Sequence, residues 1–213
     1  MSTPQSNPPV LVAGGGIGGL AAALALVRQG FRVKVLEQSP EIGEIGAGIQ
    51  LGPNAFHAFD ALGVGELTRS RAVFTDYMVM HDAIDEYQVG RIPTGEAFRA
   101  RFGNPYAVIH RVDVHLSLLE GAQETGRVDF LTSTRVVGIE QDEDSVTVFD
   151  QHGNAHRGLA LIGADGVKSV VRKSLFGDDE TNFTGMIAWR AVIPMERLPE
   201  RMHSMVGWTW SGS

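Results

Sequence analysis

The 213-residue sequence contains no cysteine. Without thiols there is no disulfide framework, no thiolate metal site and no cysteine nucleophile. The absence is compatible with a reducing compartment, so we expect a cytoplasmic protein. The seven histidines have no spacing typical of a catalytic or metal-ligating pair. The sequence therefore predicts no metal site, and no catalytic residue is named from it.

The chain also lacks a long uninterrupted apolar run and an excess of positive charge. Residues 11–27 are its longest apolar-rich stretch, but five glycines interrupt them, so we expect neither a membrane span nor a signal peptide. The 18 Lys and Arg residues are outnumbered by 25 Asp and Glu residues, which gives a net charge of −7. Binding to a phosphate backbone needs a basic surface, so nucleic acid is not an expected partner.

What remains is typical of a soluble globular protein, with 43% hydrophobic and 20% charged residues. The length is sufficient for one large domain or one and a half small ones. Residues 1–8, MSTPQSNP, are polar and are predicted to form a flexible leader.

The first organised segment has the pattern of a strand, a helix and a second strand. We predict a buried strand over 10–13, a helix over 17–29 that ends at Gly30, and a strand over 31–36 with Glu37 at its end. Together these make one βαβ unit of a doubly wound α/β fold.

After Glu37 the pattern changes. A glycine-dense loop and strand lead into a predicted helix over 53–62, and no second βαβ unit follows at once. Residues 72–110 are strand-like and mixed in polarity, which predicts an inserted antiparallel sheet.

The second half of the chain returns to alternating elements. The spacing of Val112, Leu116 and Leu119 predicts a helix. Successive strands are predicted after it, followed by a helix and by one more strand from Gly185 onward. The predicted turns lie at 143–144 and 152–154, and the predicted helix covers 167–176.

Gly14, Gly16 and Gly19 form a G-x-G-x-x-G pattern between the first strand and the first helix. Gly14 permits a tight turn, Gly16 lets the backbone approach a pyrophosphate, and Gly19 lets helix and strand pack closely. The helix N-terminus supplies N–H donors for the anion. Glu37 stands 18 positions after Gly19, near the ~20 expected for a carboxylate that accepts ribose hydroxyls and repels the 2′-phosphate of NADP. The pattern alone does not choose between NAD and FAD.

Three further glycines, Gly46, Gly48 and Gly52, leave an extended segment almost bare of side chains. A flat ligand could lie against such a backbone, and turns within a loop are an equally good explanation.

Two charged positions lie at ends of predicted strands. Asp165-Gly166 ends an apolar strand, with Arg172 on the following helix, and a carboxylate at this edge of an α/β sheet faces the ligand crevice. Capping of the helix by Asp165 is the alternative. Arg111 begins a predicted helix after YAVIH, where it could bind a phosphate bidentately or form an ordinary surface salt bridge.

The motifs VAGGGIGGLAAALAL…VLEQ, GAGIQLGPNA, HRVDVH and GADGVKSVVR together give a family resemblance. The chain resembles the FAD-dependent aromatic hydroxylases, single-component flavoprotein monooxygenases with a p-hydroxybenzoate hydroxylase-like fold. FHAFDALGVGE and MHDAIDEYQVGRIPTG place it nearest the branch of 3-hydroxybenzoate 6-hydroxylases and salicylate hydroxylases. The resemblance runs from about Val10 to Arg190.

The resemblance implies an α/β fold in which a Rossmann-like FAD-binding domain carries an inserted, incomplete antiparallel sheet of the substrate domain. The FAD-binding domain would comprise residues 9–71 and 107–178, and the partial substrate domain residues 72–106 and 179–213. Chains of this family are roughly twice as long, and their second flavin motif is missing here. We therefore expect this chain to be an N-terminal fragment.

The resemblance also implies roles for individual residues. Glu37 would bind the adenosine ribose, Arg111 the phosphates, and the Val136 backbone the adenine. Asp165 and Gly166 would belong to a motif that serves both FAD and NAD(P)H, supported by Arg172. The remaining implied contacts are those of Gly14, Gly16 and Gly19 with the pyrophosphate and of Ala47 and Gly48 with the isoalloxazine.

The implied reaction is hydroxylation of a small aromatic acid with NADH or NADPH and O₂, with 3-hydroxybenzoate and gentisate as the expected substrate and product. A homodimer is possible for the full-length form. Two alternatives stay open: an inactive FAD-binding remnant and an NAD-dependent dehydrogenase. Continued βαβ units, which the dehydrogenase requires, are not predicted here.

The remaining aromatic and histidine side chains suggest no specific role. Trp189, Trp208 and Trp210 could face an aromatic substrate, but packing in the core is the expectation. His110 and His115 are five positions apart, which is off one helical face. Like the other histidines, they are expected at the surface or in packing.

Overall fold

The structure is a computed structural model that describes residues 8–43, 46–177, 182–187, 189, 191–203 and 206–211. The predicted leader lies outside these residues, apart from Pro8. The chain forms two compact units: unit 1 contains residues 1–44 and 115–187, and unit 2 contains residues 45–114 and 188–213. The functional domain boundaries expected from the sequence stay a prediction.

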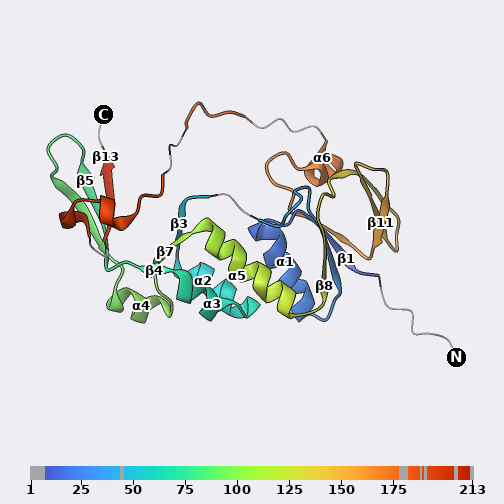
Figure 1. Ribbon diagram of the computed structural model, residues 1–213, viewed down its shortest axis with the longest axis horizontal. Helices are drawn as coiled ribbons and strands as arrows, with labels where there is room; N and C mark the ends of the chain where they lie inside the picture. Colours follow the sequence, from blue (N-terminus) through green and yellow to red (C-terminus); the bar gives the residue numbers. More distant parts are fainter. Residues whose placement is uncertain are drawn as a thin grey trace. The chain divides into compact units, whose positions relative to one another are not determined.

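Unit 1 is built on a four-stranded parallel sheet in the order β12-β1-β2-β8. Figure 1 labels β1, β8 and helix α1 of this unit. Helix α1 connects β1 to β2, as the sequence predicted, and ends beside Gly30. The elements are β1 (Val10–Ala13), α1 (Ile17–Arg28), β2 (Val33–Leu36), β8 (Val128–Leu131) and β12 (Leu161–Gly163). All three strand pairs are parallel, which confirms the Rossmann-type α/β fold.

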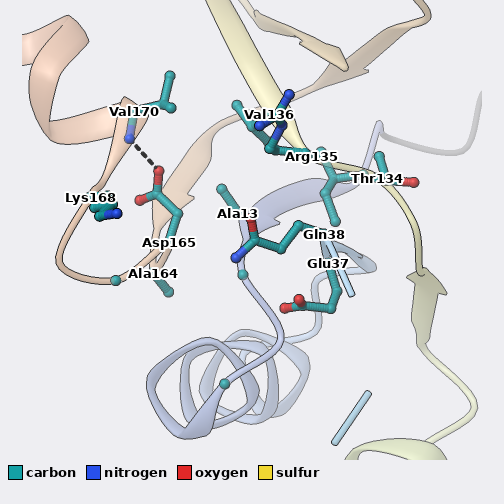
Figure 2. A pocket seen from close by; sticks show the side chains of 14 residues that line it. Ala13, Glu37, Gln38, Thr134, Arg135, Val136, Ala164, Asp165, Lys168 and Val170 are labelled. Carbon is teal, nitrogen blue, oxygen red and sulfur yellow. Dashed lines mark hydrogen bonds between the residues drawn. The ribbon is translucent and has the colours of Figure 1, made fainter. Parts of the chain in front are cut away.

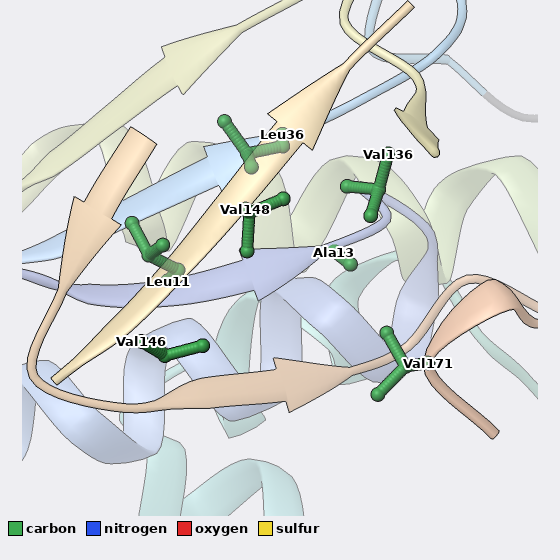
Figure 3. Close-up of a cluster of buried hydrophobic side chains, with 7 residues drawn as sticks. All are labelled: Leu11, Ala13, Leu36, Val136, Val146, Val148 and Val171. Atoms are coloured by element: carbon green, nitrogen blue, oxygen red, sulfur yellow. The ribbon is translucent and has the colours of Figure 1, made fainter. Parts of the chain in front are cut away.

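Alternating side chains of β1 enter two separate cores because successive residues of a strand point to opposite faces. Val12 packs with Ala23 and Val27 of α1 on one face of the sheet. Leu11 and Ala13 point to the other face, into the cluster drawn in Figure 3. Both faces of the strand are thus covered, which explains its continuous apolar sequence. Burying each valine or leucine contributes about 1.5–3 kcal/mol.

The second face of the parallel sheet is covered by a three-stranded antiparallel sheet and a short helix. Val136, Val146, Val148 and Val171 come from these elements and meet Leu11 in the same cluster (Figure 3). The elements are β9 (Val136–Gln141), β10 (Val146–Asp150), β11 (Ala155–Gly158) and α6 (Val170–Phe176). The turns predicted at 143–144 and 152–154 are confirmed.

Helix α6 begins later than predicted. The sequence placed its start at Val167, whereas the first helical residue is Val170. Ser169 is the N-cap, and its hydroxyl oxygen accepts a hydrogen bond from the Arg172 N–H at 2.9 Å. A serine in this position satisfies a backbone donor that the first helical turn cannot.

Helix α5 (Arg111–Glu124) is confirmed, but its buried stripe differs from the predicted one. His115, Leu118 and Ala122 are fully buried, whereas Leu116 and Leu119 are only partly buried. The stripe is rotated by one residue, about 100° around the helix. The apolar pattern did not reveal this rotation because a polar side chain, His115, occupies the buried face.

Unit 2 contains two three-stranded sheets, in the orders β3-β7-β4 and β13-β5-β6. The strand at β3 and the helix at α2 agree with the sequence prediction. The strands are β3 (Gly48–Leu51), β4 (Val73–Phe74), β5 (Tyr77–Asp82), β6 (Gln88–Pro93), β7 (Ala107–His110) and β13 (Val206–Ser211). The helices are α2 (Pro53–Leu62), α3 (Gly65–Arg71), α4 (Glu96–Phe102), and the 3-10 turns η1 (Met195–Arg197) and η2 (Glu200–Met202).

Three predictions about strands need correction. Residues 72–110 are not strand-like throughout, because 96–102 form α4, in which Phe98 contacts Phe102 one turn later with ring centroids 4.6 Å apart. The predicted strand from Gly185 is wrong for 185–187, 189 and 191–194, and residues 188 and 190 lie outside the described residues. In addition, β13 pairs with β5 in parallel, so the inserted sheet is mixed.

A buried carboxylate closes the β10–β11 turn. Asp150 Oδ1 accepts hydrogen bonds from the His152 and Asn154 N–H groups at 2.8 and 3.0 Å. Its Oδ2 accepts from the Asn154 side chain and from His156 Nε2, both at 3.0 Å. These bonds, that of His156 first, lower the pKa of Asp150 below its ordinary value despite the burial that opposes ionisation.

We predict a pH-dependent stability contribution from Asp150. Because the folded-state pKa is depressed, the stabilisation is complete above the unfolded pKa of about 4 and is lost as pH falls through the folded value. Asp150→Asn should therefore lower the melting temperature at pH 7, and the difference from wild type should shrink in acid below pH of about 4. Thermal melts across pH measure this. Asp144→Asn, an exposed carboxylate in the other turn, is the control; a gap for Asp150→Asn that does not vary with pH contradicts the prediction.

Candidate functional site

Unit 1 contains a cavity of about 420 Å³ at the carboxyl ends of its parallel strands. This is where open α/β sheets bind ligands. Figure 2 shows Glu37 and Asp165, which line the cavity and follow the ends of different strands, β2 and β12. The lining residues are Ala13, Gly14, Gly16, Leu36, Glu37, Gln38, Thr134, Arg135, Val136, Ala164, Asp165, Gly166, Lys168 and Val170.

Two glycines of the loop are required by packing. Gly14 has a φ of +103°, and a Cβ there would clash with the carbonyl oxygen of Ala164. A Cβ at Gly19 would clash with the carbonyl oxygen of Gly14. Helix α1 can therefore approach the ends of β1 and β12 only because both side chains are missing.

Gly16 differs from these two glycines. Its φ is −74°, and a Cβ built there meets no atom within 4 Å. Gly16 lines the cavity, so the space beside it is open to a ligand. The fold tolerates a side chain at this position, and the missing side chain lets a bound group approach the backbone.

The start of α1 lies at the cavity, because Gly16 lines it. Gly16 is the N-cap, no described side chain forms a capping hydrogen bond at this end, and the first turn holds no acidic residue. The positive end of the helix dipole and the N–H groups of the first turn together favour an anion. This geometry fits a pyrophosphate.

Glu37 holds the loop from the end of β2. Its Oε2 accepts a hydrogen bond from the Gly15 N–H at 2.6 Å, and its Oε1 accepts from the Ser39 N–H at 2.8 Å. A carboxylate has about four acceptor positions, so each oxygen keeps one for a hydroxyl donor. Glu37 can hold the loop and still accept hydrogen bonds from a ribose.

Asp165 anchors α6 and also lines the cavity. Its Oδ1 accepts from the Ser169 hydroxyl at 2.5 Å, and its Oδ2 accepts from the Val170 and Val171 N–H groups at 2.7 and 3.2 Å. Asp165 thus caps the start of α6, which was the alternative left open by the sequence, and it does so from a position that lines the cavity. Arg172 Nη2 donates to the Val167 carbonyl at 2.9 Å, within the same loop.

The structure adds cavity residues that the sequence did not single out. Lys168 and Arg135 are cationic, and Gln38 and Thr134 are polar. Each stands within three positions of a predicted site residue, so proximity to the motifs in the sequence could have identified them. Val136 is buried and lines the cavity as the first residue of β9.

Ala47, Gly48 and Arg111 belong to unit 2 and are grouped there. The Arg111 N–H donates to the Ala47 carbonyl at 3.1 Å, and β3 begins at Gly48 opposite His110. A Cβ at Gly46 would lie 2.8 Å from Arg111 Cβ, so this glycine makes room for the arginine. Their contact with a ligand of unit 1 stays a prediction.

The expected core packing of the tryptophans is wrong. Trp208 and Trp210 are 38% and 46% exposed, and Trp189 is 93% exposed. Trp208 and Trp210 are two positions apart on β13, so their side chains lie on the same face of the strand. Both rings stack on His81, with distances between ring centroids of 5.3 Å for Trp208 and 6.0 Å for Trp210.

Other site classes find no support in the part of the chain that the structure describes. No group of three or more His, Asp or Glu side chains there could hold a metal ion. None of its helices has both the length and the apolar character that crossing a bilayer requires.

With this geometry in view, residues 7–210 match the family described as "FAD binding domain". The chain belongs to this family. The match confirms FAD as the dinucleotide of this class and favours it over the NAD-dependent dehydrogenase alternative.

Two relatives within the family are similar to the chain over nearly its whole length. The chain is 73% identical over 212 residues to the 3-hydroxybenzoate 6-hydroxylase of Polaromonas naphthalenivorans (strain CJ2), covering 100% of this chain and 53% of that protein. It is 54% identical over 202 residues to the 3-hydroxybenzoate 6-hydroxylase of Klebsiella oxytoca, covering 95% and 51%. The chain thus spans about half the length of these relatives, as expected from the resemblance.

Solved structures share the fold. Klebsiella pneumoniae HpxO complexed with FAD and uric acid matches with a TM-score of 0.69 and 28% identity, over 78% of this chain and 41% of that one. The tetrameric form of 2-methyl-3-hydroxypyridine-5-carboxylic acid oxygenase matches with a TM-score of 0.69 and 28% identity, over 80% and 42%.

We predict that Gly16→Val prevents FAD binding without unfolding the chain. The backbone at Gly16 suits valine and nothing lies within 4 Å of the new Cβ, but the side chain enters the cavity. FAD affinity should fall at least ~10-fold, about 1.4 kcal/mol, while the melting temperature changes little.

Gly18→Val is the matched control, because Gly18 is exposed, also has open space at its Cβ and does not line the cavity. Fluorescence titration of FAD against both variants gives the affinities. Equal affinities for the two variants would contradict the assignment of the cavity.

Proposed function

We propose that this chain is the FAD-binding part of an FAD-dependent aromatic monooxygenase. The observation that carries the proposal is the cavity of unit 1, which is lined both by Gly16, the N-cap of α1, and by the carboxylate residue Glu37. Gly16 and the first turn of α1 would hold the pyrophosphate, and Glu37 the adenosine ribose. Family membership and the FAD-bound relatives support this ligand.

We propose roles for the remaining predicted residues toward the same ligand. Val136 with Thr134 and Arg135 would surround the adenine, and Asp165 and Gly166 would lie along the pyrophosphate, with Arg172 bracing their loop. Ala47, Gly48 and Arg111 are proposed to contact the isoalloxazine and phosphates from unit 2. FAD supplies the redox chemistry when bound, and these residues bind and orient it.

The proposed reaction is hydroxylation of 3-hydroxybenzoate to gentisate with NADH or NADPH and O₂. The names of the relatives that are 73% and 54% identical support this substrate. The exposed rings of Trp208 and Trp210, stacked with His81, offer a flat surface suited to an aromatic ring. We also propose a cytoplasmic location; a homodimer is one possible assembly, and the pyridine-carboxylic acid oxygenase was solved as a tetramer.

The first experiment is the absorbance spectrum of the purified 213-residue chain after FAD is added and free FAD removed. We expect flavin bands between ~350 and ~500 nm, which belong to the cofactor. NADH oxidation is then followed with and without 3-hydroxybenzoate or salicylate. Bound FAD without stimulated oxidation favours the inactive-remnant alternative, and a chain that retains no FAD contradicts the proposal.

We predict that Glu37→Ala weakens FAD binding roughly 10-fold, since it removes the ribose acceptor and the hydrogen bond that holds the Gly15 N–H. Glu140→Ala is the matched control, because Glu140 is an exposed glutamate on β9 that does not line the cavity. Flavin content after gel filtration and a fluorescence titration are the measurements. Unchanged FAD affinity in Glu37→Ala would remove the assigned role.

A further inference from the structure

His115 is a buried polar side chain that the cavity does not account for. It lies on α5, is fully buried, and its Nε2 is 2.8 Å from the Gly15 carbonyl oxygen. A carbonyl oxygen only accepts, so Nε2 carries the proton and donates. One hundred residues separate the two partners, so the bond joins α5 to the glycine loop.

Gly15 is consequently held on both sides. Its N–H donates to Glu37 Oε2 at 2.6 Å, and its carbonyl accepts from His115 Nε2 at 2.8 Å. Gly15 itself does not line the cavity, but Gly14 and Gly16 on either side of it do. The two side chains therefore fix the orientation of the peptide units next to the proposed phosphate position.

The peptide geometry links His115 to the donor at Gly16. The Gly15 carbonyl and the Gly16 N–H share one planar peptide unit, and no described peptide bond is cis. In a trans unit the two groups point in opposite directions. A carbonyl held toward α5 therefore turns the Gly16 N–H away from α5 and leaves it free for a ligand.

We propose that His115 is a positioning residue that presents the Gly16 N–H to the pyrophosphate of FAD. The inference rests on the proposed function, and it adds a residue outside the cavity to the binding machinery. Preorganised donors bind an anion better because no reorientation is needed when the ligand arrives.

The second ring nitrogen supports a specific role over simple packing. Nδ1 of His115 is buried and has no hydrogen-bond partner among the described residues. An unpaired buried acceptor is unfavourable, and an apolar side chain of similar size would avoid this penalty. The bond to Gly15 is the gain that a leucine at this position would lack.

The test compares His115→Leu with His115→Gln in the 213-residue chain. Leucine fills the space without a donor, whereas the glutamine Nε2 can donate from nearly the same position. We expect the FAD dissociation constant of His115→Leu to rise about 10-fold and that of His115→Gln to stay within about threefold of wild type. Titration with ADP and adenosine separates phosphate binding from general damage.

Weaker ADP binding with unchanged adenosine binding supports the proposal, and equal losses for both ligands overturn it. Wild-type FAD affinity in a folded His115→Leu chain also overturns it. A wild-type chain that binds no FAD overturns the proposed function, and this inference with it. Should the leucine variant not fold, ¹⁵N NMR of wild type decides instead: a protonated Nε2 is required, and a ring protonated only at Nδ1 overturns the proposal.

Discussion

The close approach of α1 to the ends of β1 and β12 is the constraint on which unit 1 depends. Gly14 and Gly19 make it possible because neither position has room for a Cβ. The approach sets the start of the helix directly at the strand ends, where its N-cap residue, Gly16, lines the cavity. The hydrogen bonds of Glu37 and His115 then act on a loop whose path is already defined by packing.

The three glycines of the loop therefore have separable roles. Gly14 and Gly19 serve the fold, and changing them would remove the cavity along with the packing. Gly16 keeps the space beside the helix start open, and the fold itself would tolerate a side chain at this position. The clashes that a Cβ would cause at Gly14 and Gly19, and the open space at Gly16, agree with the separate roles that the motif predicts for the three positions.

The elements that the sequence predicted well are those whose side chains bury in a regular period. The βαβ unit follows from alternating cores on β1 and a helix stripe on α1, and the change of pattern after Glu37 falls near the start of unit 2 at Ile45. Helix α4 was missed because its aromatic contacts, such as Phe98–Phe102 and Phe98–Tyr106, lie within a segment of mixed polarity. The buried role of His115 was missed because apolar periodicity does not register a polar group in a core stripe.

The cavity also shows how a chain of net charge −7 can favour an anion. Net charge governs long-range attraction, whereas binding depends on the groups within a few ångströms. Here those groups are the uncapped helix N-terminus and the Lys168 and Arg135 side chains, while two backbone N–H groups compensate the Glu37 carboxylate. In the proposed binding mode both signs of charge have a place along one ligand, with donors for a diphosphate and an acceptor for the hydroxyls of the neighbouring sugar.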